Sequence, residues 1–351
     1  MCEGEVVSIP WGKSRAVKDV MKYYKGKFIT ADNRIATSNN TSVLLNKFLY
    51  YWMMTQSDVI DSFYRGSGLK HPSMKDVLDM RMPVPPLEVQ SEIVRILDNF
   101  TELTAELTAE LTARKKQYEY YRNMLLSFDD VSIVPLRQTD RQTDRQTDRQ
   151  TDRQIQWLKL SEIGPVSMCK RIKKAETTAD GDVPFYKIGT FGKTADAYIS
   201  QETYDKYRLN YSFPKKGSIL ISAAGTIGRT VIYDGEAAYY QDSNIVWIDN
   251  DESTVLNKYL YYCYQLKPWN VSTGGTIARL YNDNIAKAKI AVPPLEEQRR
   301  IVAILDRFDA LCNDLTSGLP AEIEARKKQY EYYRDKLLSF KELPQGGDLC
   351  A

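Results

Sequence analysis

The sequence lacks the side-chain groupings on which most catalytic and metal sites depend. It has a single histidine, His71, so a zinc site built from several imidazoles is excluded. Its five cysteines show no Cys-x-x-Cys spacing, which favours reduced thiols over a disulfide framework. No Ser-His-Asp or Cys-His arrangement stands in a useful context, so acyl-transfer chemistry has no candidate. We therefore expect no catalytic residue, no metal and no cofactor bound by this chain.

Two further absences limit where the protein acts and what it binds. The chain has no apolar run of about 18 residues and no signal-peptide pattern, so we expect a cytoplasmic protein without membrane contact. Its 48 Lys and Arg nearly balance its 46 Asp and Glu. A basic surface for nucleic acid must therefore be local. At 351 residues and 43% hydrophobic, the chain is long enough for two or three domains.

The chain contains two copies of one unit. The first segment is Val-Pro-Pro-Leu-Glu-Val-Gln-Ser-Glu-Ile-Val-Arg-Ile-Leu-Asp-Asn-Phe at residues 84–100, and it returns at 292–308 as Val-Pro-Pro-Leu-Glu-Glu-Gln-Arg-Arg-Ile-Val-Ala-Ile-Leu-Asp-Arg-Phe. A second segment, beginning Ala-Arg-Lys-Lys-Gln-Tyr-Glu-Tyr-Tyr-Arg at residues 113–128, returns at 325–340. An internal repeat at such a long spacing indicates repeated structural units, and here it predicts two related halves.

Each copy predicts a long helix that begins at a proline pair, because Pro is tolerated in the first helical turn. Apolar side chains then recur at steps of three and four, the pattern of a coiled-coil seam. The predicted seam residues are Ile93, Leu97, Phe100, Leu107, Leu111, Tyr118 and Tyr121 in the first copy, and Ile301, Leu305, Phe308, Leu315, Tyr330, Tyr333 and Leu337 in the second.

The middles of the two helices differ. Residues 101–112 of the first helix contain a Thr-Ala-Glu-Leu repeat, and each added unit lengthens a helix by about 6 Å and rotates the residues beyond it by about 40°. Either the helix grew by slippage without consequence, or its length sets a distance between the modules that flank it. In the second helix, Gly318 and Pro320 oppose helical structure, so we expect a kink there.

The segment that precedes the second helix predicts a mixed α/β domain. Short strand-like runs at 218–222, 230–233 and 244–248 stand between turn residues, and 254–266 reads as a helix. Four loops carry cations or hydroxyls, most of them close to glycine, an arrangement that suits phosphates and base edges. Any one of these loops alone is more often a solvated turn, but four in one domain beside a repeated helix favour DNA binding. Their candidate DNA-binding residues are Lys170, Arg171, Lys173, Lys187, Thr190, Thr226, Arg229, Gly274, Gly275, Thr276 and Arg279.

The first copy aligns with the second over part of its length. The Asn-Lys-Phe-Leu-Tyr-Tyr run at residues 46–51 matches Asn-Lys-Tyr-Leu-Tyr-Tyr at 257–262, whereas residues 155–213 have no counterpart ahead of Met1. We therefore expect a first domain that lacks its front half. Its candidate DNA-binding residues are Lys13, Arg15, Gly68, Lys70 and His71.

Between the halves, Gln-Thr-Asp-Arg occurs four times at residues 138–153. Charged and polar side chains alone cannot form a core, so this tract is a solvated linker. The codons CAG-ACA-GAC-AGA would encode it as a repeated tetranucleotide, and gain or loss of one unit would shift the reading frame. We hypothesise a slippage switch, that is, phase variation, whose short product ends after the first helix and associates with a copy of itself. A neutral repeat remains the alternative.

These features together resemble the specificity subunit of Type I restriction–modification systems. The resemblance rests on two domains, each followed by a Pro-Pro-Leu-Glu-x-Gln helix that ends in Arg-Lys-Lys-Gln-Tyr-x-Tyr-Tyr-Arg, with a Thr-Ala-Glu-Leu spacer. It implies a mixed α/β fold of two target-recognition domains, the first incomplete, joined by two long antiparallel coiled-coil helices with pseudo-two-fold symmetry. The expected boundaries are 1–83 for the first domain, 84–130 for its helix, 131–154 for the linker, 155–291 for the second domain, 292–342 for its helix and 343–351 for the tail.

The resemblance also implies a function and partners. Each domain would read one half of a split site in double-stranded DNA, with residues 274–279 in a DNA-facing loop and 66–71 as its first-domain equivalent. Two methyltransferase subunits would dock on the helices and motor-nuclease subunits would join them, so that S-adenosylmethionine and ATP bind to partners. The alternative is a structural protein that titrates methyltransferase subunits through its helices without binding DNA.

Overall fold

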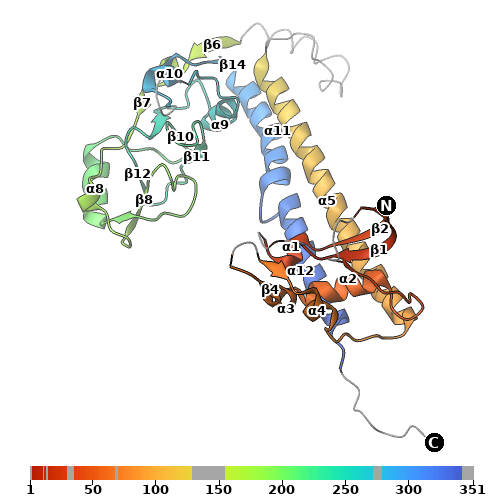
Figure 1. The fold of residues 1–351 in the computed structure, drawn as a ribbon. Coiled ribbons are helices and arrows are strands. Elements are labelled where there is room, and N and C mark those ends of the chain that lie inside the picture. Colours follow the sequence, from red (N-terminus) through yellow and green to blue (C-terminus); the bar gives the residue numbers. More distant parts are fainter. Residues whose placement is uncertain are drawn as a thin grey trace, which may run out of the picture. The chain divides into compact units, whose positions relative to one another are not determined.

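The computed structural model describes residues 2–10, 12, 15–29, 35–67, 70–128, 155–271 and 279–341 (Figure 1). The chain forms two compact units. Unit 1 comprises residues 1–113 and 313–351, and unit 2 comprises 114–312. The predicted linker with its Gln-Thr-Asp-Arg repeats lies outside the described residues.

Unit 1 is built around a three-stranded antiparallel sheet of order β2-β1-β3. Its apolar core joins the inner side of the sheet to helix α2, where Phe48 is fully buried. The elements of the first half of the chain are β1 (Cys2–Ser8), α1 (Val17–Val20), β2 (Lys22–Phe28), β3 (Ile35–Ala36), α2 (Asn46–Thr55), α3 (Ser57–Ser62), β4 (Tyr64–Arg65), β5 (His71–Pro72), α4 (Met74–Leu78) and α5 (Leu87–Ser127).

Unit 2 contains a four-stranded sheet of order β11-β10-β13-β7 and a three-stranded sheet of order β12-β8-β9. Strands β10 and β13 are buried along their whole length, because side chains cover both faces of the larger sheet. The strands of this half are β6 (Gln156–Lys159), β7 (Val166–Ser167), β8 (Val183–Tyr186), β9 (Tyr198–Ile199), β10 (Ile219–Ser222), β11 (Thr230–Ile232), β12 (Tyr239–Tyr240), β13 (Ile245–Ile248) and β14 (Lys289–Val292).

One helix was predicted within the second domain, and the structure contains it. The expected helix at 254–266 is α9, at Asn257–Gln265. The other helices are α7 (Leu160–Ile163), the short 3-10 helix η1 (Lys174–Glu176), α8 (Gln201–Asn210), α10 (Asn282–Lys287), α11 (Leu295–Asn313) and α12 (Leu319–Leu337). The mixed α/β class expected from the sequence is confirmed.

The two halves share one core motif. In unit 1, β1 pairs antiparallel with β2 on one side and β3 on the other. In unit 2, β10 pairs antiparallel with β11 and β13 in the same chain order, and α9 follows as α2 does in unit 1. The second sheet, β12-β8-β9, has no equivalent among the described residues of unit 1. The repeated sequence therefore folds into a repeated sheet and helix.

A buried glutamine attaches each domain to the start of its long helix. Gln90 is fully buried; its Oε1 accepts from the Leu45 N–H at 2.9 Å, and its Nε2 donates to the carbonyls of Val43 (2.8 Å) and Pro85 (2.7 Å). The second copy repeats this pattern at Gln298, with Leu256, Thr254 and Pro293 as partners at 2.9, 2.9 and 2.8 Å. Each buried amide thus has its own donor and acceptor groups satisfied by three backbone groups of the domain and the helix start.

A tyrosine and a lysine make a second attachment two turns further along each helix. The Tyr51 hydroxyl donates to Asp98 at 2.5 Å, and Lys47 Nζ lies 2.8 Å from the same carboxylate. In the second copy, the Tyr262 hydroxyl donates to Asp306, and Lys258 Nζ lies 3.1 Å from it. The repeated sequence motifs Asn-Lys-x-Leu-Tyr-Tyr and Leu-Asp thus form the same contact in both copies.

Within each unit the long helices run antiparallel. In unit 1, Ile93 and Leu97 of α5 share a core with Leu337 of α12 and with Leu338 just after it, and the Phe100 ring stacks on Tyr333 at 5.5 Å between centroids. In unit 2, Tyr121 of α5 meets Phe308 of α11 at 5.6 Å. Residue numbers rise along one helix as they fall along its neighbour, as the resemblance implies.

The predicted seam residues differ in their burial. Ile93, Leu97, Tyr118, Ile301 and Leu305 are buried. Partly exposed positions are Phe100, Leu107, Leu111, Tyr121, Phe308, Tyr330 and Leu337, while Tyr333 is 39% exposed.

The assignment of Leu315 to the seam is wrong, because this side chain is 80% exposed. The helix expected over 292–342 is two helices, with a full break where a kink was expected. Asp314 accepts hydrogen bonds from the Thr316 N–H (2.7 Å) and from the hydroxyls of Thr316 (2.6 Å) and Ser317 (2.5 Å), which favours a turn over helix. Gly318 then caps α12, whose first turn carries the proline.

Helix α5, by contrast, continues through its repeat. Thr104, Thr108 and Thr112 each donate a hydroxyl hydrogen bond to the carbonyl four residues earlier, at 2.7–2.9 Å. The threonine side chains are therefore satisfied by the helix itself, and α5 extends over 41 residues. At 1.5 Å per residue, it is about 60 Å long.

Three cysteines of the second half are unpaired and buried. Cys169, Cys263 and Cys312 are free, and burial raises the pKa of the Cys169 and Cys263 thiols to about 12. They are therefore packing residues, consistent with the reduced thiols expected from their spacing. Within the described ranges, no helix is both long and apolar enough to cross a membrane, and no three His, Cys, Asp or Glu side chains group as metal ligands.

Candidate nucleic-acid interface

Three loops of unit 2 leave its sheets at a common end. β8 and β12 pair in parallel, so the loops that follow them, 187–192 and 241–244, start side by side. The second of these loops leads into β13, which is antiparallel to β10. It therefore also lies beside loop 223–229, which follows β10.

Hydrogen bonds tie these loops together and add a fourth segment. The Ile188 N–H donates to Gln241 Oε1 at 2.9 Å, and the Ala223 N–H donates to the Asn244 carbonyl at 2.7 Å. The Leu280 N–H in turn donates to the Ala223 carbonyl at 2.9 Å. We call residues 187–192, 223–229, 241–244 and 279–281 the interface loops.

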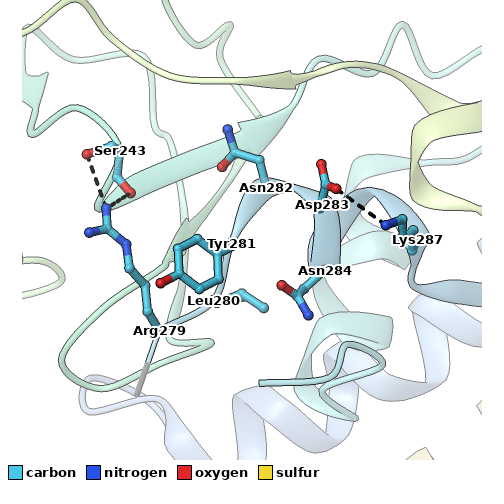
Figure 2. Close-up of a pocket in the computed structure, with 8 residues that line it drawn as sticks. All are labelled: Ser243, Arg279, Leu280, Tyr281, Asn282, Asp283, Asn284 and Lys287. Carbon is cyan, nitrogen blue, oxygen red and sulfur yellow. Dashed lines mark hydrogen bonds and ion pairs between the residues drawn. The ribbon is translucent and has the colours of Figure 1, made fainter. Parts of the chain in front are cut away.

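Arg279 borders an open pocket of ≈ 680 Å³ at the interface loops. Its Nη2 donates to the Ser243 carbonyl (3.2 Å) and hydroxyl (3.3 Å) and to Asn244 Oδ1 (3.4 Å). Figure 2 shows the guanidinium directed towards Ser243, with the ion pair of Asp283 and Lys287 on another side of the pocket. The pocket lining is Ser243, Arg279, Leu280, Tyr281, Asn282, Asp283, Asn284 and Lys287.

Arg171 is held at the same loops by Asp242. Its Nε lies 2.8 Å from Asp242 Oδ2, yet the arginine side chain is 72% exposed whereas the aspartate is 19% exposed. A guanidinium has five N–H donors, so a contact through Nε leaves others for a phosphate or a base edge. Asp242 thus positions a cation at the surface.

The neighbouring cations of this segment have different contacts. Lys170 Nζ lies 4.9 Å from the centre of the Tyr211 ring, and the Lys170 carbonyl accepts from the Tyr239 hydroxyl at 2.9 Å. Lys173 is exposed, and its backbone N–H donates to Glu176 at 2.7 Å. Both side chains are exposed, and both residues lie within two positions of Arg171 in the sequence.

Loop 223–229 depends on glycine for its conformation. Gly225 and Gly228 have φ of 63° and 77°, which L side chains rarely adopt, and a Cβ at Gly228 would lie 3.1 Å from the Trp269 ring. The tight turn directs Arg229 back across the loop, where Nη1 donates to the Phe191 carbonyl at 2.9 Å and Nη2 to Thr226 Oγ1 at 3.4 Å. Arg229 therefore joins two interface loops.

Lys187 and Thr190 lie in the remaining loop. Lys187 Nζ pairs with Asp196 at 2.8 Å, and Thr190 Oγ1 accepts from the Lys187 N–H at 3.1 Å. The lysine side chain is 42% exposed. Four of the predicted residues, Lys187, Thr190, Thr226 and Arg229, thus lie on adjoining loops with Arg279.

Comparison with known proteins identifies the family. The family model described as the Type I restriction modification DNA specificity domain matches residues 12–114 and 154–325. The chain belongs to this family.

Relatives agree with this assignment. The chain is 48% identical over 347 residues, covering 96% of it and 83% of the relative, to a Haemophilus influenzae protein named as a putative type I restriction enzyme specificity subunit. It is 33% identical over 329 residues, with coverages of 88% and 74%, to the EcoR124I/EcoR124II specificity subunit of Escherichia coli. These matches extend across both halves of the chain.

A solved structure supports the fold of this specificity subunit. The S subunit of a Type I restriction–modification system from M. genitalium has a TM-score of 0.59 at 14% identity, with 97% of this chain and 85% of that one covered. At so low an identity, the likeness supports the architecture alone.

The structure reveals interface residues of the specificity subunit that the sequence reasoning missed. The interface loop 241–244 contacts the other interface loops and Arg171, but it contains neither the glycine nor the cation by which the other loops were selected. Ser243 adopts φ of 52°, a left-handed conformation that costs about 1 kcal/mol or more outside glycine. A polar run between two aromatic-rich strands was the available signal.

The predicted residues of the first half are less clearly grouped. Arg15 and Lys70 are exposed, and His71 lies in β5, where it pairs across a short hairpin with Arg65. Five other predicted residues, Lys13, Gly68, Gly274, Gly275 and Thr276, lie outside the described residues.

Proposed function

We propose that this specificity subunit reads one half of a split DNA site through the interface loops of unit 2. The observation that carries the proposal is the contact of Arg171 and Arg279 with the polar loop 241–244, beside the loops joined by Arg229, in a chain of the DNA specificity family. Arginines held by carbonyl or carboxylate acceptors are pre-oriented, and pre-orientation lowers the entropy lost when they bind a phosphate or a guanine.

We further propose that the chain is the non-catalytic scaffold of a larger complex. Two methyltransferase subunits dock on its helices and motor-nuclease subunits join them, so that S-adenosylmethionine and ATP bind to these partners. The 41-residue α5 is long enough to set a spacing between two half-sites. The complex acts on DNA in the cytoplasm.

The test compares Arg171→Ala and Arg279→Ala with a matched lysine variant within the complex reconstituted with methyltransferase subunits. Binding to random-sequence DNA is measured by electrophoretic shift, and the selected site by methylation mapping. The matched control is Lys216→Ala, because this exposed cation lies ahead of β10, at the end of the strand opposite the interface loops. We expect roughly tenfold weaker binding for each arginine variant, and a relaxed site if the arginine contacts a base.

The alternative function, titration of methyltransferase subunits without DNA binding, predicts a different result. The wild-type complex would then protect no split sequence, and neither arginine variant would differ from Lys216→Ala. The family match to a DNA specificity domain in both halves does not favour this alternative.

A further inference from the structure

Helix α8 and the basic segment 170–176 of unit 2 lie against each other. Lys170 Nζ lies 4.9 Å from the centre of the ring of Tyr211, the residue that follows α8. The Tyr207 hydroxyl, on α8 itself, donates to Glu176 at 3.0 Å. The two ends of the segment therefore both contact the helix or the residue after it.

The same segment reaches the interface loops. Arg171 pairs with Asp242 at 2.8 Å, and the Lys170 carbonyl accepts from the Tyr239 hydroxyl at 2.9 Å. Tyr239 begins β12, and Asp242 belongs to the interface loop that follows this strand. An exposed surface therefore continues from the interface loops across the segment to the end of α8.

This surface is strongly basic. Residues 170–176 and 204–211 contain six cations and two carboxylates, a net charge of +4, whereas the whole chain carries +2. Both carboxylates, Glu176 and Asp205, accept hydrogen bonds from other groups of the domain, at 2.7 and 3.0 Å. All six cations are exposed: Lys170, Arg171, Lys173, Lys174, Lys206 and Arg208.

Aromatic rings hold two of these cations in place. Arg208 Cζ lies 5.6 Å from the centre of the Phe213 ring and 5.8 Å from that of Tyr204, much as Lys170 lies over Tyr211. A contact with the face of a ring orients a cation without using its hydrogen-bond donors for another acceptor. Arg208 and Lys170 are therefore oriented donors at the surface.

Apolar side chains are exposed among the cations. Leu209 is 86% exposed and Tyr211 is 45% exposed, so the core of the domain does not require the leucine. Surfaces that bind nucleic acid combine lysine and arginine, which neutralise phosphates, with apolar and aromatic side chains that contact sugars and bases. We call the six cations, Leu209 and Tyr211 the basic flank.

We propose that the basic flank binds the phosphates of the duplex next to the half-site, outside the base pairs that the interface loops read. The proposal rests on the proposed function, which puts DNA on the adjoining loops. Charge complementarity and the continuity through Arg171 favour DNA over an acidic protein as the occupant. Phosphate contacts position a protein without reading sequence, so the flank adds affinity to a site that the loops select.

The experiment uses the full chain in the complex reconstituted with methyltransferase subunits, bound to a duplex that extends beyond the methylated site on both sides. Lys206→Ala with Arg208→Ala removes two cations of the flank, whereas Lys206→Arg with Arg208→Lys keeps both charges. The control is Lys159→Ala with Lys289→Ala, which removes two exposed cations paired across β6 and β14. Figure 1 shows these strands well apart from α8 within unit 2.

The double alanine variant should bind DNA with a weaker dependence on salt. The slope of log affinity against log salt concentration should fall in magnitude by about 2, because each phosphate contact contributes about 0.9. Hydroxyl-radical footprinting should show lost protection of the backbone next to the half-site and unchanged protection within it, and methylation mapping should find the same sequence. The charge-keeping variant and the control should match the wild type.

Leu209→Ala tests the apolar part of the basic flank. We expect roughly threefold weaker binding with an unchanged slope, because the substitution removes apolar contact and no charge. Leu78→Ala, at an exposed leucine of unit 1, should leave binding unchanged. Wild-type affinity of the Leu209 variant would overturn the assignment of this side chain to the contact.

Three results would overturn the proposal as a whole. One is a wild-type slope and footprint for the double alanine variant, which is also the result expected if an acidic protein covers the flank. Another is a changed methylated sequence, which would show that the flank reads bases. The third is a reduced slope in the charge-keeping variant or the control, which would show that the effect does not depend on these two charges.

A failure of the proposed function has a different signature. The wild-type complex would then bind DNA without a preferred sequence, yet the double alanine variant would still show the reduced slope. If instead the complex selects a site and the slope is unchanged in this variant, DNA reading stands and the basic flank does not.

Discussion

The two copies of the repeat are alike where a domain meets its helix and unlike where a domain faces outward. Gln90 and Gln298 make the same three hydrogen bonds, and Tyr51 and Tyr262 donate to equivalent aspartates. The sheet β12-β8-β9 and the interface loops belong to the second copy, and no equivalent sheet occurs in the described part of the first. The attachment is therefore a constant element, to which different recognition surfaces can be joined.

Replacement of either buried glutamine should have the largest effect on this shared attachment. Gln90→Ala or Gln298→Ala leaves one N–H and two carbonyls without their partner, and we expect a loss of roughly 2–4 kcal/mol in unfolding free energy. Hydrogen exchange of the full chain should show faster exchange near Leu45 or Leu256, respectively. Glu88→Ala and Glu296→Ala, which alter neighbours outside the core, should leave both regions protected. A strong effect in one copy only would show that the attachments differ.

Removal of the tyrosine hydroxyls should have a smaller effect than loss of the glutamines, and the effect should be similar in the two copies. Tyr51→Phe and Tyr262→Phe each delete a hydrogen bond to a carboxylate, and the expected loss is about 1.5 kcal/mol in denaturant titrations. The lysine that pairs with each aspartate remains, which limits the loss. No change in either variant would mean that lysine alone makes the contact.

The same tyrosines should make the protein sensitive to alkaline pH. Burial, and next the hydrogen-bonded carboxylate, raises the pKa of Tyr51 and Tyr262 above the ordinary value. A raised folded-state pKa contributes stability that is complete below the unfolded value of about 10 and is lost as pH rises above it. Unfolding free energy measured across that range should fall more steeply in the wild type than in Tyr51→Phe. Tyr120→Phe, at an exposed ring, serves as the control.

The smallest effect is expected at the break between α11 and α12. Leu315→Ala should change the unfolding free energy by no more than about 0.5 kcal/mol, because its side chain is exposed. Leu107 is the equivalent residue of the first copy, 208 positions earlier, and it is half-buried. Leu107→Ala should therefore lower the unfolding free energy by about 1 kcal/mol. Equal losses in thermal melts would indicate that the second helix re-forms across the break in solution.

Periodicity predicted the long helices well, because it depends on local spacing, and internal repetition predicted that they occur twice. The seam at Ile93, Leu97, Ile301 and Leu305 is buried, as a step of three and four requires. Leu315 fits the same spacing but lies in a turn, since hydrogen bonds to Asp314 compete with the helix. The spacing of apolar residues does not show where side-chain hydrogen bonds will replace those of the helix.

The recognition surface was harder to predict, because its residues are distant in the sequence. A basic run led to Arg171, and cations near glycine led to Arg229 and Arg279. Nothing local to Asp242 or Ser243 indicates that they contact two of these arginines. The parallel pairing of β8 with β12 places that loop among the others.

By itself, the sequence determined the two long helices, the mixed α/β class and the family, since a repeated pattern of apolar and polar residues specifies which faces must be buried. Only the tertiary structure decided which exposed groups lie together. Strand pairing brings loops from distant parts of the chain to one edge, and helix packing separates the tyrosines that fill a core from those that face outward.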